Sequence, residues 1–286
     1  MEEIDLRSTE LKEISQPPVM EYISAFSPSG SATFEQCPKQ WYFKYVAKLP
    51  DPKGEDAVLG TFTHSVLELL LQEPANNRTK AKAKAIAREI WPEVENDPDF
   101  VALSLSDVEA LEFRKRSWTA IEGLWELEHP QGVEVASTEL EVKVELSSIP
   151  FRGFIDRVER EDGGLVITDY KSGKAPSKRF EDDKLQQVLL YAAALEELDG
   201  HRPKRARLLF LANRDKKGNS QNRRVVEVEV TEKNLTQATK KFKRNWEELN
   251  AACTSGTFHA KPQILCKWCS FLQNCPQGQE WVSPSR

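Results

Sequence analysis

The chain has 286 residues, of which 39% are apolar and 30% are charged, enough for one large domain or for a core with decorations. No stretch approaches the ~18 consecutive apolar residues that a membrane span needs, and residues 1–18 are acidic and polar, unlike a signal peptide. We therefore expect a cytoplasmic protein with no membrane span. The formal net charge of −5 does not by itself indicate nucleic-acid binding, although acidic catalytic groups would also lower it.

The first 130 residues are predicted to be mainly helical, after a poorly ordered arm at residues 1–25. From Phe26, serine and proline cap signals open a helical stretch that carries aromatic side chains at Phe34, Trp41, Tyr42, Phe43 and Tyr45. Gly60 precedes a helix over 61–72, in which apolar residues recur on one face. Two more helices are predicted over 78–91 and 106–128.

After residue 130 the period of the apolar residues changes to the alternation of strands. Three strands are predicted in succession, over 137–148, 151–162 and 164–173. A turn containing Pro150 joins the first two, and a turn of Asp162, Gly163 and Gly164 joins the next two. There follow a helix over 182–198 ended by Gly200, strands over 205–213 and 223–230, and a long helix over 231–252 capped by Thr231. The predicted fold class is α/β, with a helical region before the core and a small metal-bearing tail after it.

Three cysteines lie close together near the C-terminus, at Cys266, Cys269 and Cys275. Five cysteines in the whole chain are too few and too unevenly spread for a disulfide framework, so metal ligation is the better use of this cluster. A closed tetrahedral site needs four ligands, and the cluster supplies three. The C-x2-C-x5-C spacing therefore predicts part of a metal site whose fourth ligand lies elsewhere.

The densest chemistry lies on the second and third predicted strands. Asp169 and Lys171 are two apart on a strand, so their side chains project from the same face. If the two strands pair antiparallel, Asp156 can lie close to Asp169. Two carboxylates and an ammonium at one point suit Mg²⁺ or Mn²⁺, with the lysine orienting or deprotonating water or stabilising phosphoryl charge. The alternative is an ordinary salt bridge, because acidic and basic residues alternate on many strands.

Each of the other candidate residues is weaker evidence for a functional site when taken alone. His64 opens an otherwise apolar helix, where a histidine is more often packed or hydrogen-bonded than bound to a metal. Glu139 and Glu141, on the first predicted strand, could supply a further carboxylate. Gln187 and Tyr191 are four apart on one helix and share a face, which ordinary packing would equally explain.

Basic residues cluster in three runs, each of which is either a solvated face or part of a surface for nucleic acid. The runs are Lys171, Lys174, Lys178 and Arg179; then Arg202, Lys204, Arg205 and Arg207; then Lys240, Lys241, Lys243 and Arg244. The net charge does not decide between the two interpretations.

Five motifs occur in a characteristic order: SPSGSATFEQCPKQWYFKYV, GTFTH, GFIDRV, DYKSG and QVLLY. Together they resemble the RecB-like branch of the PD-(D/E)XK nuclease superfamily, with the Cas4-like nucleases closest. The resemblance extends from about Phe26 to Pro276, and its specificity lies in the order of the motifs rather than in any one of them. It implies a restriction-endonuclease-like core, a mixed central sheet flanked by helices.

The resemblance also implies roles for the candidate residues. His64, Asp156 and Asp169 match metal ligands of the family, and Lys171 matches its catalytic lysine. The cation implied is Mg²⁺ or Mn²⁺.

Gln187 and Tyr191 match the helical Q-x3-Y motif, which in the family organises the site and contacts DNA. Some members have a further catalytic carboxylate upstream of GFID. For it Glu139 is the first choice and Glu141 the second.

The fourth cysteine ligand also follows from the resemblance, since the family often closes a [4Fe–4S] cluster with one early cysteine and three late ones. Cys37 joins the C-terminal three in this arrangement, and Cys253 is left as a buried or free thiol. Four thiolates suit either Zn²⁺ or an iron–sulfur cluster. Zinc more commonly uses two C-x2-C pairs, so the spacing of one plus three favours a [4Fe–4S] cluster, which would tie both ends of the chain together.

The expected organisation is an arm at 1–25, a helical region at 26–130, a nuclease core at 131–252 and an iron–sulfur segment at 253–286. The expected function is that of a metal-dependent DNA nuclease, most simply an exonuclease on single-stranded ends in repair, recombination or processing, with a helicase as a possible partner. One alternative is a CRISPR adaptation factor that trims prespacers with integrase partners. The other is a non-catalytic DNA-binding module, against which the presence of Asp156, Asp169 and Lys171 argues.

Overall fold

The computed structural model describes residues 17–211 and 223–283. Residues 1–16 of the predicted arm at 1–25 lie outside the described residues, as do residues 212 and 213 of the strand predicted over 205–213. From Pro18 to Glu21 the chain forms a short 3-10 helix, η1, in which Val19 is fully buried. The chain is therefore already packed before Phe26.

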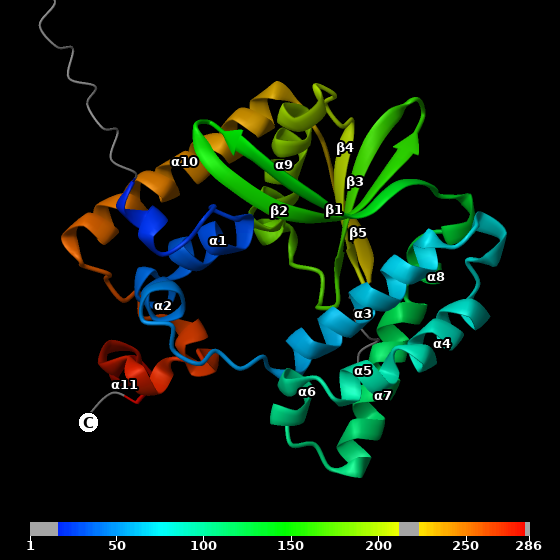
Figure 1. The fold of residues 1–286 in the computed structure, drawn as a ribbon, viewed down its shortest axis with the longest axis horizontal. Coiled ribbons are helices and arrows are strands. Elements are labelled where there is room, and N and C mark those ends of the chain that lie inside the picture. Colours follow the sequence, from blue (N-terminus) through cyan, green and yellow to red (C-terminus); the bar gives the residue numbers. More distant parts are fainter. Residues whose placement is uncertain (1–16, 212–222, 284–286) are drawn as a thin grey trace, which may run out of the picture.

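Five strands form one mixed sheet in the order β1-β2-β3-β4-β5 (Figure 1). They are β1 (Glu134–Leu146), β2 (Ile149–Glu161), β3 (Gly164–Lys171), β4 (Arg205–Phe210) and β5 (Arg224–Glu229). The first three pair antiparallel, β4 lies parallel to β3 after a crossover through α9 (Glu181–Asp199), and β5 is antiparallel to β4. The prediction of a mixed central sheet flanked by helices is confirmed.

The turn between β1 and β2 differs from the predicted one. Ser147 and Ser148 make it, with φ of 54° and 61°, while Pro150 lies inside β2. The Pro150 carbonyl accepts a hydrogen bond from Phe26 N at 2.7 Å, on the side away from β1. The proline nitrogen points to the same side, so the β1–β2 ladder does not lose a donor.

Helices make up most of the rest of the described chain. Before the sheet come α1 (Pro28–Gln36), α2 (Pro38–Trp41), the π-helical η2 (Tyr42–Val46), α3 (Glu55–Gln72), η3 (Ala75–Asn77), α4 (Lys80–Glu89), α5 (Trp91–Glu95), α6 (Pro98–Ala102), α7 (Asp107–Glu122), α8 (Leu124–Leu127) and η4 (Pro130–Gly132). After β3 come η5 (Lys178–Phe180), α9, α10 (Glu232–Ser255), η6 (Ile264–Trp268), η7 (Leu272–Asn274) and α11 (Pro276–Val282). Among the described residues, no helix combines the length and the apolarity that crossing a membrane requires.

Helix α3 begins earlier than predicted, at Glu55, so Gly60 and His64 both lie inside it. A Cβ at Gly60 would lie 3.1 Å from Ser172 Oγ, in the segment that follows β3. The glycine is therefore a point of close approach and not a helix start. It lets α3 bring His64 against the sheet.

Two hydrophobic clusters fill opposite faces of the sheet, because neighbouring residues of a strand point to opposite sides. Leu208 belongs to the cluster formed with α1, α9 and α10, and Leu209 to the cluster formed with α3, α4 and α7. Phe26 and Trp41 lie in the first cluster, so the chain up to η2 packs with the sheet and not with the helices that follow it. The domain boundaries at 130 and 252 stay predictions.

Strands β2 and β3 separate at the predicted catalytic residues. Their ladder runs from Arg157 opposite Thr168 to Glu161 opposite Gly164. From Ile149 to Asp156 the described chain pairs β2 with β1 on one edge, and only an isolated bridge from Phe26 reaches the other edge, at Phe151. The sheet therefore opens into a fork, called here the β2–β3 fork.

Candidate active site

Asp156 lies at the base of the β2–β3 fork, one residue beyond the last pair of the ladder. Its Oδ2 accepts a hydrogen bond from Tyr170 N at 2.7 Å and lies 3.3 Å from His64 Nδ1. The side chain of Asp156 thus holds β3 where backbone pairing between the strands ends. It also faces α3 across the fork.

The imidazole of His64 is oriented by the backbone of the same residue, Tyr170. Its Nε2 lies 2.9 Å from the carbonyl oxygen of Tyr170, so Nε2 carries the hydrogen and Nδ1 faces Asp156. Burial alone would lower the pKa of His64, but the hydrogen bond to Asp156 and its charge outweigh burial and raise that pKa. In this arrangement Nδ1 is the atom that can exchange a proton for a metal ion.

Glu139 completes a group of three. One ligand atom from each of His64, Glu139 and Asp156 lies within 4.8 Å of the other two, a spacing that a single metal ion can bridge. Glu139 has a φ of 45°, a left-handed conformation that is unfavourable for this residue. Burial raises the pKa of Glu139, and the charges of Asp156 and Glu68 add to the rise. A bound cation would relieve this crowding of carboxylates.

Glu141, the second choice for the extra carboxylate, points elsewhere. Its carboxylate pairs with Arg152 at 2.6 Å, and both side chains are about half exposed. The geometry brings Glu139 and not Glu141 to His64 and Asp156.

Asp169 and Lys171 share the face of β3 that packs against α9. Lys171 Nζ lies 2.7 Å from Asp169 Oδ2, but this ion pair lacks hydrogen-bond geometry, which leaves a buried oxygen unsatisfied. Burial raises the pKa of Asp169 to about 6 against the opposing charge of Lys171, and the charge of Asp156 raises it further. Asp169 lies outside the 4.8 Å group, so the structure places it beside the three residues rather than among them.

A chain of polar contacts runs from Lys171 to helix α9. Lys171 Nζ donates to Gln187 Oε1 at 3.0 Å, and Gln187 Nε2 donates to Tyr191 OH at 3.2 Å. Burial raises the pKa of Tyr191 to about 12, so its hydroxyl stays neutral. Gly153 makes room for this ring, because a Cβ there would lie 2.5 Å from Tyr191 Cε1. The residues of the predicted Q-x3-Y motif therefore position the lysine.

A buried polar network on the opposite face of the sheet was not predicted. Arg157 is fully buried and donates to both carboxylate oxygens of Glu128, at 2.6 and 2.7 Å, and to Tyr170 OH at 2.7 Å. It also lies 2.7 Å from Glu159 Oε2. The sequence did carry a signal, since five of the six residues from Asp156 to Glu161, on a predicted strand, are charged.

The network locks the two strands of the fork at the level of the site. Arg157 directly follows Asp156, and Tyr170 stands between Asp169 and Lys171. The backbone N–H of Tyr170 donates to Asp156, its carbonyl oxygen accepts from His64, and its hydroxyl accepts from Arg157. The network therefore fixes the backbone that presents Asp156, Asp169 and Lys171.

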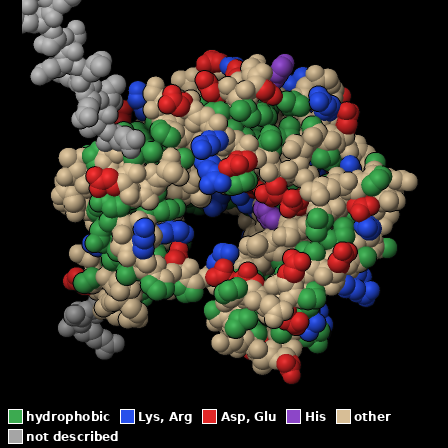
Figure 2. All heavy atoms as spheres, in the orientation of Figure 1, with side chains coloured by type: hydrophobic (Ala, Val, Ile, Leu, Met, Phe, Trp, Pro, Cys, Tyr) green, Lys and Arg blue, Asp and Glu red, His purple; other side chains and the backbone are tan. Residues whose placement is uncertain are grey.

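Two clefts border this site, and Ser29 lines both of them. The lysine cleft, of about 700 Å³, is lined by His64, Lys171, Lys174, Lys184, Gln187 and Lys241 among others. The β2-edge cleft, of about 610 Å³, runs along the free edge of β2 and is lined by Tyr22, Arg152, Phe154, Asp156 and Tyr191 among others. Figure 2 shows this face of the molecule hollowed at its centre, with acidic and basic side chains gathered at the rim.

The predicted basic runs divide by their contacts. Lys171 and Lys174 line the lysine cleft, as does Lys241 from the third run, which also pairs with Glu35 at 2.9 Å. In the second run, Arg202 lies within 2.9 Å of Glu196 and 2.6 Å of Glu232, while Arg205 and Arg207 pair with glutamates of β2. The second run therefore braces the sheet and its neighbouring helices and is not part of the cleft surface.

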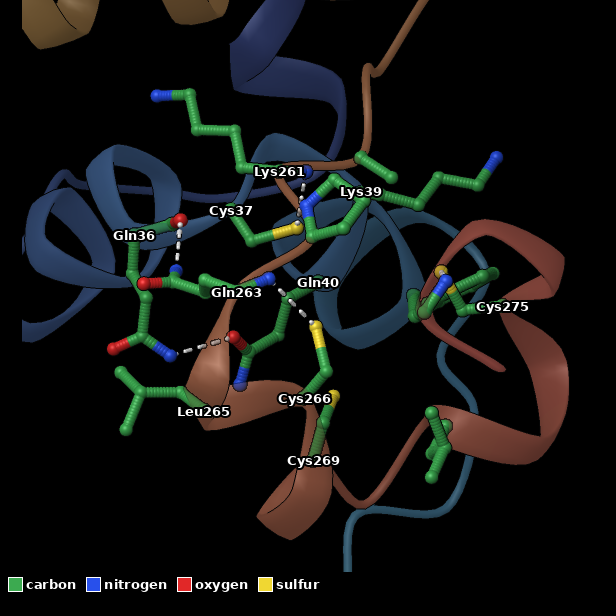
Figure 3. Close-up of a pocket in the computed structure, with 15 residues that line it drawn as sticks. Gln36, Cys37, Lys39, Gln40, Lys261, Gln263, Leu265, Cys266, Cys269 and Cys275 are labelled. Atoms are coloured by element: carbon green, nitrogen blue, oxygen red, sulfur yellow. Dashed lines mark hydrogen bonds between the residues drawn. The ribbon is translucent and has the colours of Figure 1, made fainter. Parts of the chain in front are cut away.

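Four of the five cysteines line one pocket where the two ends of the chain meet (Figures 1 and 3). Cys37 follows α1, Cys266 lies in η6, and Cys269 and Cys275 follow in the same C-terminal segment. Lys261 N donates to Cys37 Sγ at 3.4 Å across 224 positions of sequence. Cys253 lies on α10 and is not among the residues that line this pocket; burial raises its pKa to about 11.

The sulfur atoms accept backbone hydrogen bonds but do not form a group as close as the one at the fork. Backbone N–H groups donate to Cys266 Sγ at 3.3 Å and to Cys275 Sγ at 3.4 Å, the kind of contact that tunes iron–sulfur clusters. Burial raises the pKa of Cys269, and the other three thiolates add to the rise. Around one zinc ion the sulfurs would be roughly 3.8 Å apart. Within the described chain, however, the group gathered within 4.8 Å is His64, Glu139 and Asp156, and not the cysteines.

The family model of the PD-(D/E)XK nuclease superfamily matches residues 25–276, and the chain belongs to this superfamily. Nucleases of this superfamily use divalent metal ions, which agrees with the acidic group around Asp156. A crystal structure from Eubacterium rectale named "Putative exonuclease" covers 98% of this chain and 99% of its own, at a TM-score of 0.54 and 12% identity, and so shows a shared fold.

A second solved structure, of SSO0001, covers 82% of this chain and 98% of its own at 12% identity. Its TM-score to this chain is 0.35. No curated protein sequence matches the chain.

Proposed function

We propose that this protein is a divalent-metal-dependent exonuclease that hydrolyses phosphodiester bonds at the ends of single-stranded DNA. The observation that carries the proposal is the junction of the two clefts at the β2–β3 fork. There the group of His64, Glu139 and Asp156 lies beside the ion pair of Asp169 and Lys171. A strand lying in both clefts would pass this point.

The metal site would be held by His64, Glu139 and Asp156, with Asp169 alongside. Carboxylate oxygens and one imidazole suit Mg²⁺ or Mn²⁺. A cation bound there supplies Lewis-acid polarisation of the phosphodiester and a lowered pKa for an attacking water. Tyr170 keeps Nδ1 of His64 and Oδ2 of Asp156 turned toward each other, so the chain presents these two ligand atoms in advance.

Lys171 would stabilise the negative charge that develops on the phosphoryl group or orient the water. An ammonium has three hydrogens, and here it faces Asp169 on one side and Gln187 on the other. Lys171 also lines the lysine cleft, so a hydrogen that Gln187 does not accept is available there. Lys174, Lys184 and Lys241 in the same cleft would hold the phosphates of the strand.

We further propose that Cys37, Cys266, Cys269 and Cys275 bind a [4Fe–4S] cluster with a structural role. The pocket that all four cysteines line and their one-plus-three spacing in the sequence support this choice over zinc. Binding free energy at such a site would add to folding free energy, because it joins segments that are distant in sequence.

The decisive experiment uses anaerobically purified protein and end-labelled single-stranded and duplex DNA with Mg²⁺ or Mn²⁺. We expect mononucleotide or short products from the single strand, and no cleavage by Asp169→Ala or Lys171→Ala. Glu139→Gln should lower the apparent metal affinity by at least the roughly 10- to 100-fold that loss of a residue supporting a ligand costs, while Glu141→Gln, on the surface, serves as the matched control. Wild-type rates in Asp169→Ala or Lys171→Ala would overturn the assignment of the site.

A further inference from the structure

Phe154 is an exposed aromatic residue in an unusual place. It lies on β2 two residues before Asp156, yet 43% of its surface is exposed, and it lines the β2-edge cleft together with Asp156. Single exposed apolar residues are common, so the informative observation is that Phe154 shares a cleft with Asp156. Its ring therefore offers an uncovered apolar face beside the candidate metal ligands.

The opening of the sheet creates this place. β3 leaves β2 after Arg157, so the edge of β2 from Arg152 to Asp156 has no β3 partner in the described chain. Residues 22–25 border the cleft on its other side. The gap is lined by backbone edge, small residues and the rings of Tyr22, Phe154 and Tyr191.

The two clefts differ in chemistry. The lysine cleft carries four lysines with Glu35 and Asp183, whereas the β2-edge cleft carries Arg152 and Asp156 together with the three aromatic residues. The Arg152 guanidinium lies 5.4 Å from the centre of the Phe154 ring, a cation–π distance that fixes the ring from one side. Lysines suit phosphates, while a fixed and exposed ring suits the flat face of a base.

We propose that Phe154 is the stacking platform for a nucleobase next to the scissile phosphate, so that the site selects unpaired DNA. The bases of a duplex are already paired and stacked, so they cannot reach the ring without being separated. Base–aromatic stacking is indifferent to sequence, which suits a nuclease that digests any strand. This inference rests on the proposed nuclease function and deepens it by naming a residue that sets the substrate class.

Binding without cleavage can be measured in a Lys171→Ala background. The probes are single-stranded oligonucleotides that each carry one 2-aminopurine at a different position, because stacking on a ring quenches its fluorescence. We expect quenching at one position, its loss in Lys171→Ala with Phe154→Ala, and its recovery with Phe154→Trp. Affinity should fall roughly 5- to 150-fold on loss of the ring, the range measured for one stacked base.

Phe180 provides a matched control. It is 50% exposed, Arg179 lies 5.4 Å from its ring centre, and it is not among the residues that line either cleft. Phe180→Ala should leave both affinity and quenching unchanged. An abasic nucleotide at the quenched position should weaken binding to the parent protein and have no further effect once Phe154 is alanine.

The outcomes separate the two proposals. Two results would overturn the stacking platform while leaving the nuclease proposal intact. One is a DNA affinity of Phe154→Ala within twofold of its parent. The other is that the abasic nucleotide and Phe154→Ala weaken binding independently, so that their fold-changes in affinity multiply. Wild-type protein that binds and quenches but cleaves no DNA with either metal would overturn the nuclease proposal alone. Wild-type protein that binds no DNA would overturn both.

Discussion

Replacing Arg157 with methionine tests whether the buried network below the site holds the fork together. The substitution keeps an unbranched apolar stem but removes the guanidinium, which leaves Glu128, Glu159 and Tyr170 OH without their shared donor. Removing one partner of a buried ion pair costs about 3–5 kcal/mol. Glu159 keeps Arg207 as a second cation, and Glu128 is 12% exposed and can be hydrated, so we expect the lower end, about 3 kcal/mol.

The measurement is urea unfolding of the metal-free protein followed by tryptophan fluorescence. Arg160→Met is the matched control, because Arg160 lies on the same strand, is 62% exposed and is 3.9 Å from Glu134. An exposed pair of this kind contributes about 0–1 kcal/mol. A loss under about 1 kcal/mol for Arg157→Met would refute the idea that the network locks β2 to β3.

Three further predictions concern charge and the cysteine pocket. The pKa of Asp169 is raised to about 6, so the folded chain holds this proton more tightly than the unfolded chain, and the resulting stability is lost as pH rises from about 4 through 6. Metal-free Asp169→Asn should therefore melt above the wild type at pH 7.5, and the two melting temperatures should converge toward pH 4. A lower melting temperature for Asp169→Asn at pH 7.5 would contradict this. Cys37→Ser should lose the roughly four irons per chain as completely as Cys266→Ser, while Cys253→Ser keeps them, and full iron content in Cys37→Ser would exclude it as a ligand. Lys174→Gln should lower the slope of log affinity against log salt by about 0.7 for single-stranded DNA, measured by fluorescence anisotropy. Arg202→Gln should not change this slope, because Arg202 pairs with Glu196 and Glu232, and equal slopes for both variants would remove Lys174 from the DNA path.

The sequence was sufficient for the order of elements and for the residues that gather at the fork. Alternation and cap signals placed the strands and the helices α9 and α10 nearly at their observed bounds, because Gly200 and Thr231 end and begin those helices through local geometry. Errors arose where tertiary contacts decided the local structure. Gly60 was interpreted as a helix start although it serves a contact with Ser172, and Pro150 as a turn although it lies on a free strand edge.

The site was predictable as a set of residue types but not as an arrangement. Spacing of two on a strand placed Asp169 and Lys171 on one face. The sequence did not reveal that Glu139, with its left-handed backbone, would join His64 and Asp156 in one close group that leaves out Asp169. Nor did it reveal Arg157 as a buried donor, because a charged residue on a strand is normally exposed and its acceptor Glu128 is 29 positions away.

The meeting of the two chain ends at the cysteine pocket bears on how the protein is made. Trp41 stacks on Phe258 with ring centres 6.1 Å apart, and Phe43 lies 5.7 Å from Phe271. At ~5–20 residues per second a ribosome needs roughly ten to fifty seconds to go from Cys37 to Cys266. During that time the aromatic side chains of the first helices have no C-terminal partner to cover them. The first helices to leave the ribosome are therefore among the last to reach their final packing, and a chain that stops short of Phe258 would present Trp41 and Phe43 to chaperones and proteases.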